Sequence, residues 1–140
     1  MKKIISLILI AATLLLLCVT LASCASMESY KDTLKEEGYK VDITDDEDDI
    51  EDWADAYDVD ADDYDVKQIL DATHKKKGYW LVIVECGSSS KAEDLLDDLD
   101  DVIEYGEESF ELMGWDFVAE TNGSFVFFGE EHAVEAALGK

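Results

Sequence analysis

Apolar residues recur along the chain with two different periods, which predict short helices and strands. Segment 28–37 has apolar residues four apart between charges, and this spacing predicts a helix that Gly38 ends. Segment 39–43 alternates apolar and charged residues, as a half-buried strand does. A helix followed by a strand is therefore expected at the start of the folded part.

A β-hairpin is predicted from segments 66–73 and 79–86, with Gly78 in the turn between them. The second of these strands is apolar on both of its faces from Tyr79 to Val84. We therefore expect it in the middle of the sheet.

The clearest helix is predicted to open at the capping box Ser90-Lys91-Ala92-Glu93. Phe110 and Met113 continue its apolar face, and Gly114 ends the helical region. The acidic residues between the apolar ones are expected to point away from the sheet. The apolar residues of the first part are Ala92, Leu95, Leu96, Leu99, Val102 and Ile103.

A second hairpin and a last helix complete the pattern. Asn122-Gly123 is the preferred pair for a type I′ turn, so segment 124–128 is expected to return antiparallel to segment 115–120. A helix rich in alanine follows Gly129. The alternation of helices with single and paired strands predicts an α+β fold, with a small, mostly antiparallel sheet and helices packed on it.

The segment Asp42–Asp65 is acidic at 14 of its 24 positions, yet its apolar residues are three and four apart. This spacing predicts a surface helix over 47–57 with one apolar stripe. Thr44 with Glu47 offers a capping box for its start. The residues after this helix are expected to form an acidic loop.

The N-terminus has the layout of a secretory signal. Lys2 and Lys3 give it a basic start, and no charged residue follows until Glu28. The densest apolar run, 4–17, is shorter than the roughly 20 residues that a membrane-spanning helix needs. An uncleaved membrane anchor that extends through 18–22 is the alternative.

The apolar run ends in Leu21-Ala22-Ser23-Cys24, and this tetrapeptide resembles the lipobox of bacterial lipoproteins. The resemblance covers the first 24 residues. It implies that the Cys24 thiol is alkylated with diacylglycerol and that signal peptidase II then cuts immediately before Cys24. The chain is then divided into a signal peptide at 1–23, a lipidated tether at 24–28 and an acidic α+β domain at 29–140. Two or more acyl chains hold such a domain stably on a membrane.

The charge of the mature chain excludes two classes of partner. Without Lys2 and Lys3, nine lysines and no arginine stand against 35 acidic residues, a net charge of −26. Nucleic acid binding needs a basic stripe, and anionic lipid repels a like charge within about 10 Å. The expected partners are the membrane, through the N-terminal lipid, and an unknown envelope protein or ligand, but no nucleic acid.

A second resemblance involves the segment Phe127-Phe128-Gly129-Glu130-Glu131-His132-Ala133-Val134. Its aromatic strand, glycine and short Ala-Val helix resemble the C-terminal part of small Gram-positive lipoproteins of uncharacterised function. This resemblance implies no activity.

The acidic loop partly matches a calcium site, because Asp58, Asp60 and Asp62 fall at the first, third and fifth positions of an EF-hand loop. The sixth position needs a glycine and is Asp63, and the twelfth needs a glutamate and is Ile69. We therefore predict no metal centre and regard the three aspartates as candidate weak cation contacts.

The other reactive side chains predict no chemistry. His74 and His132 have no partner at the spacing of metal ligands. Cys86 ends an apolar strand and is expected to be a small core residue. We predict no catalytic residue, no cofactor and no enzymatic activity.

These observations predict a non-catalytic binding or accessory module anchored by lipid to the extracytoplasmic face of the cell membrane. Trp53 and Tyr57 are its candidate interaction surface, if their stripe is exposed. Two alternatives stay open. One is an acidic domain that responds weakly to divalent cations, and the other is an envelope enzyme whose acid and base come from distant segments.

Overall fold

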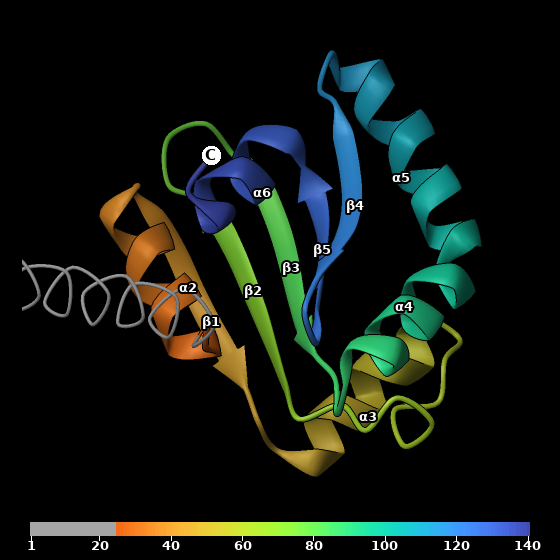
Figure 1. The fold of residues 1–140 in the computed structure, drawn as a ribbon. Coiled ribbons are helices and arrows are strands. Elements are labelled where there is room, and N and C mark those ends of the chain that lie inside the picture. Colours follow the sequence, from red (N-terminus) through yellow and green to blue (C-terminus); the bar gives the residue numbers. More distant parts are fainter. Residues whose placement is uncertain (1–24) are drawn as a thin grey trace, which may run out of the picture.

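The computed structural model of the protein describes residues 25–140, so the signal peptide predicted at 1–23 and the lipidated Cys24 lie outside the described residues. Within this part, five strands form one open sheet in the order β1-β2-β3-β5-β4, and all neighbours are antiparallel (Figure 1). The predicted α+β fold is confirmed. The strands are β1 (Tyr39–Thr44), β2 (Gln68–His74), β3 (Trp80–Glu85), β4 (Phe117–Asn122) and β5 (Phe125–Glu130).

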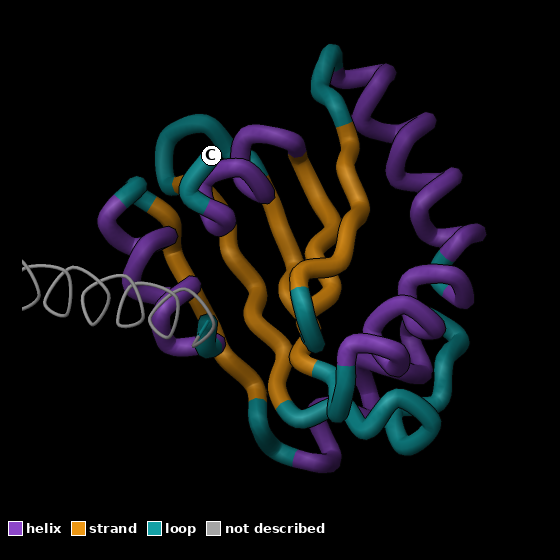
Figure 2. The backbone as a smooth tube through the Cα atoms, in the orientation of Figure 1, coloured by secondary structure: helices purple, strands orange, loops and turns teal. Residues whose placement is uncertain are grey.

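Helices cover both faces of the sheet and give the domain three layers (Figure 2). Helices α2 and α6 pack on one face, while α3, α4 and α5 lie on the other. No helix among residues 25–140 has the length and apolar content needed to cross a membrane. The helices are α2 (Met27–Glu36), α3 (Glu47–Ala56), α4 (Ser89–Asp98), α5 (Asp100–Met113) and α6 (Glu131–Leu138).

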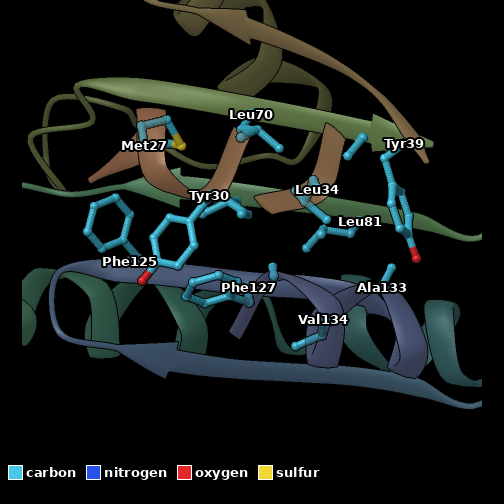
Figure 3. Close-up of a cluster of buried hydrophobic side chains, with 13 residues drawn as sticks. Met27, Tyr30, Leu34, Tyr39, Leu70, Leu81, Phe125, Phe127, Ala133 and Val134 are labelled. Carbon is cyan, nitrogen blue, oxygen red and sulfur yellow. The ribbon is translucent and has the colours of Figure 1, made fainter. Parts of the chain in front are cut away.

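The face under α2 and α6 holds the first of two apolar cores (Figure 3). Met27, Tyr30 and Leu34 of α2 are three and four residues apart, so they share the helix face that meets the sheet. Tyr30 packs edge-on against Phe125 and Phe127, with ring centroids 5.2 and 5.1 Å away. Because Met27 is buried, the packed domain begins two residues before the boundary predicted at residue 29.

The second core lies between the opposite face of the sheet and helices α3, α4 and α5. Strand β3 contributes to both cores, since Leu81 and Ile83 face the first and Val82 and Val84 face the second. This two-sided burial explains why the segment is apolar at every position. Strand β3 is the central strand of the five, which confirms its predicted place.

Both predicted hairpins form, but the turn of the second differs from the prediction. Asn122 is the last paired residue of β4 and lies opposite Phe125. The two turn residues are therefore Gly123 and Ser124, one position later than the predicted Asn122-Gly123 pair. Gly123 has a φ of 60°, and a glycine at the first turn position tolerates this conformation without a Cβ clash.

Two helices begin at other caps than predicted. Helix α3 is capped by Asp46, whose carboxylate accepts a backbone N–H of the first turn, because Thr44 is already paired in β1. Helix α4 is capped by Ser88, whose hydroxyl oxygen accepts a backbone N–H, rather than by Ser90. Helix α3 nevertheless begins at Glu47 as predicted, whereas α4 begins at Ser89, before the predicted cap Ser90.

The single helical region predicted from Ser90 to Gly114 is broken into α4 and α5 at Leu99, which is buried. After this break α5 packs along the edge strand β4. The apolar face was expected to continue to Met113, but Met113 is 53% exposed. That expectation was wrong for Met113, although Val102 and Ile103 pack against the second core as predicted.

Candidate functional site

The predicted interaction residues Trp53 and Tyr57 lie at the end of α3 and pack against the second core. Their ring centroids are 4.8 Å apart, and the Tyr57 ring meets Phe128 of β5 edge-on at 5.8 Å. Burial, followed by the charge of Asp71, raises the pKa of Tyr57. This packing means that both residues contribute to the core of the domain even when no partner is bound. Their part in an interface stays a prediction.

Asp58, Asp60 and Asp62 line one open cavity of about 580 Å³ together with Glu51 and Asp55 of α3. Asp60 accepts the backbone N–H of Asp62 at 3.0 Å, which is a local turn contact. Within residues 25–140, no group of three or more His, Cys, Asp or Glu side chains is arranged to hold a metal ion. The weak cation contacts at these aspartates stay a prediction.

The structure brings both histidines to the ring of Tyr79, where the β2–β3 turn meets α6. His132 stacks on this ring with centroids 5.2 Å apart and planes 14° apart, and His74 meets it at 6.2 Å. The Lys77 ammonium lies 5.5 Å from the same ring centre. Sequence spacing could not indicate this cluster, because His132 comes from a segment far from His74, Lys77 and Tyr79.

Glu130 lies beside this cluster and is the one charged residue of 25–140 that is fully buried. It caps α6 by accepting the N–H of Ala133 at 3.1 Å, and its other oxygen lies 2.7 Å from Nδ1 of His132. The hydrogen bond and the charge of Glu130 raise the pKa of His132. Burial, followed by the Glu130 charge, raises the pKa of Tyr39 to about 12. The Glu130 carboxylate thus lies at the N-terminus of α6, where the helix dipole favours a negative charge.

The polar atoms of this cluster serve the fold. Nδ1 of His74 accepts the backbone N–H groups of Lys76 and Lys77, each at 3.1 Å, and so closes the β2–β3 turn. Glu130 is engaged by the α6 cap and by His132. We therefore assign the cluster a structural role.

Cys86 is a buried thiol on the opposite side of the sheet, in the second core. Burial, followed by the charges of Asp65 and Glu85, raises its pKa to about 11. The sulfur is therefore a thiol rather than a reactive thiolate at neutral pH. Its predicted role as a small core residue is confirmed.

The inner face of α5 is fixed on the sheet by a glycine and aromatic rings. A Cβ added at Gly106 would lie 2.7 Å from the Phe117 ring of β4, so a glycine is what permits the close approach. Phe110 packs against Phe117 and Trp115, with ring centroids 5.2 and 6.0 Å away. These contacts hold α5 in one rotation about its axis, which decides the side chains that it presents to solvent.

Helix α5 carries the exposed large apolar side chains of the described part. Tyr105, Leu112 and Met113, here called the α5 stripe, are 74%, 91% and 53% exposed. Tyr105 and Leu112 are seven residues apart and therefore lie on one side of the helix, and Met113 follows at its end. Six residues of α5 are acidic and none is basic. The stripe is thus apolar surface inside a strongly negative border.

An open cavity of about 410 Å³ adjoins the Tyr105 end of the stripe. It combines the aromatic rings of Tyr57 and Tyr105 with the carboxylates of Asp58, Asp98 and Asp101. Aromatic faces attract cations, and carboxylates accept charge-assisted hydrogen bonds from Lys and Arg. The lining of this cavity therefore suits a cationic side chain.

A second cavity, shallow and widely open, lies at the Leu112 end, where Glu108, Glu111 and Leu112 of α5 alone line it. The C-terminal end of a helix carries a partial negative charge, and α5 has no basic residue in its last turn to offset it. This end of α5 therefore also favours a cation. The α5 stripe and the two cavities together form the candidate binding surface.

The apolar periods of the sequence do not mark Tyr105 or Leu112 as surface residues. Their seven-residue spacing was visible in the sequence, out of phase with Gly106 and Phe110. That phase difference distinguishes the outer from the inner face only after the inner residues have been placed on the sheet.

Comparisons with models of protein families, with curated proteins and with solved structures find no match for this chain. Any inference about function from the structure therefore rests on the geometry and charge of the α5 stripe and its cavities.

Proposed function

We propose that this protein is a lipid-anchored binding module on the extracytoplasmic face of a bacterial cell membrane. The observation that carries the proposal is the tetrapeptide Leu21-Ala22-Ser23-Cys24 behind a basic start and an apolar run. The module holds a partner and does not catalyse a reaction. Its acyl chains at Cys24 supply the attachment, because its charge of −26 repels anionic lipid.

The described domain begins close to the proposed anchor. Helix α2 starts at Met27 and is capped by Ser26, which forms a reciprocal capping box with Ser29. At about 3.5 Å per extended residue, Met27 lies within ~10 Å of an acylated Cys24. The domain is thus expected to lie against the membrane surface rather than on a long tether.

The arrangement of the helices supports a binding role for an anchored domain. Helix α2, next to the anchor, and helix α5, which carries the candidate surface, lie on opposite faces of the sheet (Figure 1). An anchor at the start of α2 therefore leaves the α5 stripe free to meet a partner.

The anchor is tested by expressing the full chain, Cys24→Ser and Cys18→Ser in a bacterium with signal peptidase II. We expect intact mass spectrometry of the native protein to show Cys24 as first residue with a lipid adduct, and fractionation to place it in the membrane. Cys24→Ser is expected to remain uncleaved and without lipid. Cys18→Ser is the matched control, since this thiol lies inside the apolar run and its loss should change nothing.

A native protein that carries no lipid at its first residue would overturn the proposal. Equal processing of Cys24→Ser and the native chain would do the same. The side of the membrane is tested by adding protease to cells whose outer layer is permeabilised and whose inner membrane is intact. Digestion of the domain is expected, and complete protection would contradict the extracytoplasmic location.

A further inference from the structure

We propose that the α5 stripe and its two flanking cavities dock a basic amphipathic polypeptide segment. Apolar side chains of the segment cover Tyr105 and Leu112, and its lysine or arginine side chains enter the cavities. This names the partner class of the binding module and therefore rests on the function proposed above.

The apolar part of the argument comes from α5 itself. Gly106 and Phe110 bind its inner face to β4 and the neighbouring aromatic rings, so the helix needs no outer contact to stay in place. Leu112 is nevertheless 91% exposed and Tyr105 is 74% exposed on the side away from the sheet. Covering a side chain of this size removes apolar area from water and favours association.

The charges around the stripe select the kind of partner. Helix α5 has six carboxylates and no basic residue, and both flanking cavities are lined by acids. The C-terminal end of the α5 dipole adds negative potential beside Glu108 and Glu111. A segment that places cations beside its apolar face is therefore complementary to the whole surface.

The same charges disfavour the two other occupants of an exposed apolar stripe. A second copy of the chain would bring its own six α5 carboxylates against these, with no lysine on the helix to pair with them. An anionic membrane surface repels the stripe for the same reason. A basic polypeptide is the occupant that satisfies both the apolar and the charged part of the surface.

The spacing of the two cavities sets the size of the segment. They adjoin Tyr105 and Leu112, which are seven residues apart, and at 1.5 Å per residue this corresponds to about 10 Å along α5. A partner helix spans this distance with cationic residues two turns apart and apolar residues between them.

The test uses the mature full-length protein in a neutral detergent, so that peptide binding is read whether or not Cys24 carries lipid. The probe is a helical peptide with leucines on one face and lysines on the other. Two control peptides replace the lysines by glutamates or the leucines by serines. We expect calorimetry to show saturable binding of the first peptide only, with strong weakening in about 1 M salt, where the Debye length is ~3 Å.

Variants of the surface locate the binding. Leu112→Ser is expected to lower the affinity about tenfold, while Leu112→Met keeps the apolar area and the affinity. Asp101→Asn, inside the first cavity, should weaken binding more than the matched charge change Asp100→Asn next to it, because Asp100 does not line the cavity. Circular dichroism is expected to be unchanged, since all three positions are exposed.

Three results would overturn the inference. Equal binding of the glutamate peptide would remove the charge selection, and unchanged affinity in both Leu112→Ser and Asp101→Asn would show general attraction to an acidic protein. Loss of a protein dimer, or of vesicle binding, in Leu112→Ser would assign the stripe to a second copy or to lipid. Absence of lipid at Cys24 would contradict the anchor without changing any of these peptide measurements.

Discussion

The hydroxyl of Tyr30 provides a sharp test of the packing described for the first core. This side chain is buried between α2 and the sheet, and its hydroxyl oxygen has no hydrogen-bond partner among the described residues (Figure 3). Its ring is held by edge-on contacts with Phe125 and Phe127. Tyr30→Phe removes the hydroxyl and leaves these ring contacts in place.

The expected effect is an increase in stability. A buried polar group without a partner costs about 1–3 kcal/mol relative to its hydrated state. Tyr30→Phe abolishes this cost and leaves at most a small void where the oxygen was. We expect the free energy of unfolding to rise by about 1 kcal/mol, which corresponds to an increase of about 4 °C in melting temperature for a domain of this size.

The matched control deletes the same atom from Tyr64. Its hydroxyl donates a hydrogen bond to Asp98, and this bond is the largest cause that raises the pKa of Tyr64 to about 12. Tyr64→Phe is expected to lower the free energy of unfolding by about 1 kcal/mol. Urea denaturation followed by tryptophan fluorescence measures both variants, and the two changes should have opposite signs.

A loss of 1 kcal/mol or more in Tyr30→Phe would refute the reasoning, because it would mean that the Tyr30 hydroxyl is paired in solution. Equal changes in the two variants would likewise show that the loss of an oxygen, rather than its hydrogen bonding, decides the outcome.

Two further predictions concern the sheet and the α6 cap. Gly129→Ala should destabilise the domain by about 3–5 kcal/mol, because Gly129 has a φ of 153° and an added Cβ would lie 2.7 Å from the Leu81 Cα on β3. The control Gly114→Ala, at positive φ but in open space, should cost only about 1 kcal/mol. Similar melting temperatures for the two variants would contradict the close approach of Gly129 to β3. Because Glu130 raises the pKa of His132, this pair stabilises the fold fully below about pH 6.5 and loses its contribution as the pH rises through the higher folded value. His132→Gln should remove that decline in urea midpoints measured from acidic to mildly alkaline pH, and a decline that persists would assign it to another group.

The success and failure of the sequence predictions follow from the range of the interactions involved. Segment 47–57 and the strand after Gly78 were predicted well because their periodic apolar residues report which sides are buried. The cap of α3 and the start of α4 were wrong because several nearby residues can cap a helix, and the paths of β1 and β3 choose among them. The break at Leu99 had no local signal, since its neighbours all favour or tolerate a helix.

The sequence by itself determined the kinds of elements, their approximate bounds, the central place of β3 and the acidic character of the surface, because periodicity and charge are properties of neighbouring residues. The strand order, the meeting of His74 and His132 at Tyr79, the burial of Glu130 and the exposure of Tyr105 and Leu112 were decided by the tertiary structure. Each of these depends on contacts between residues far apart in the chain, and such contacts leave no trace in local spacing.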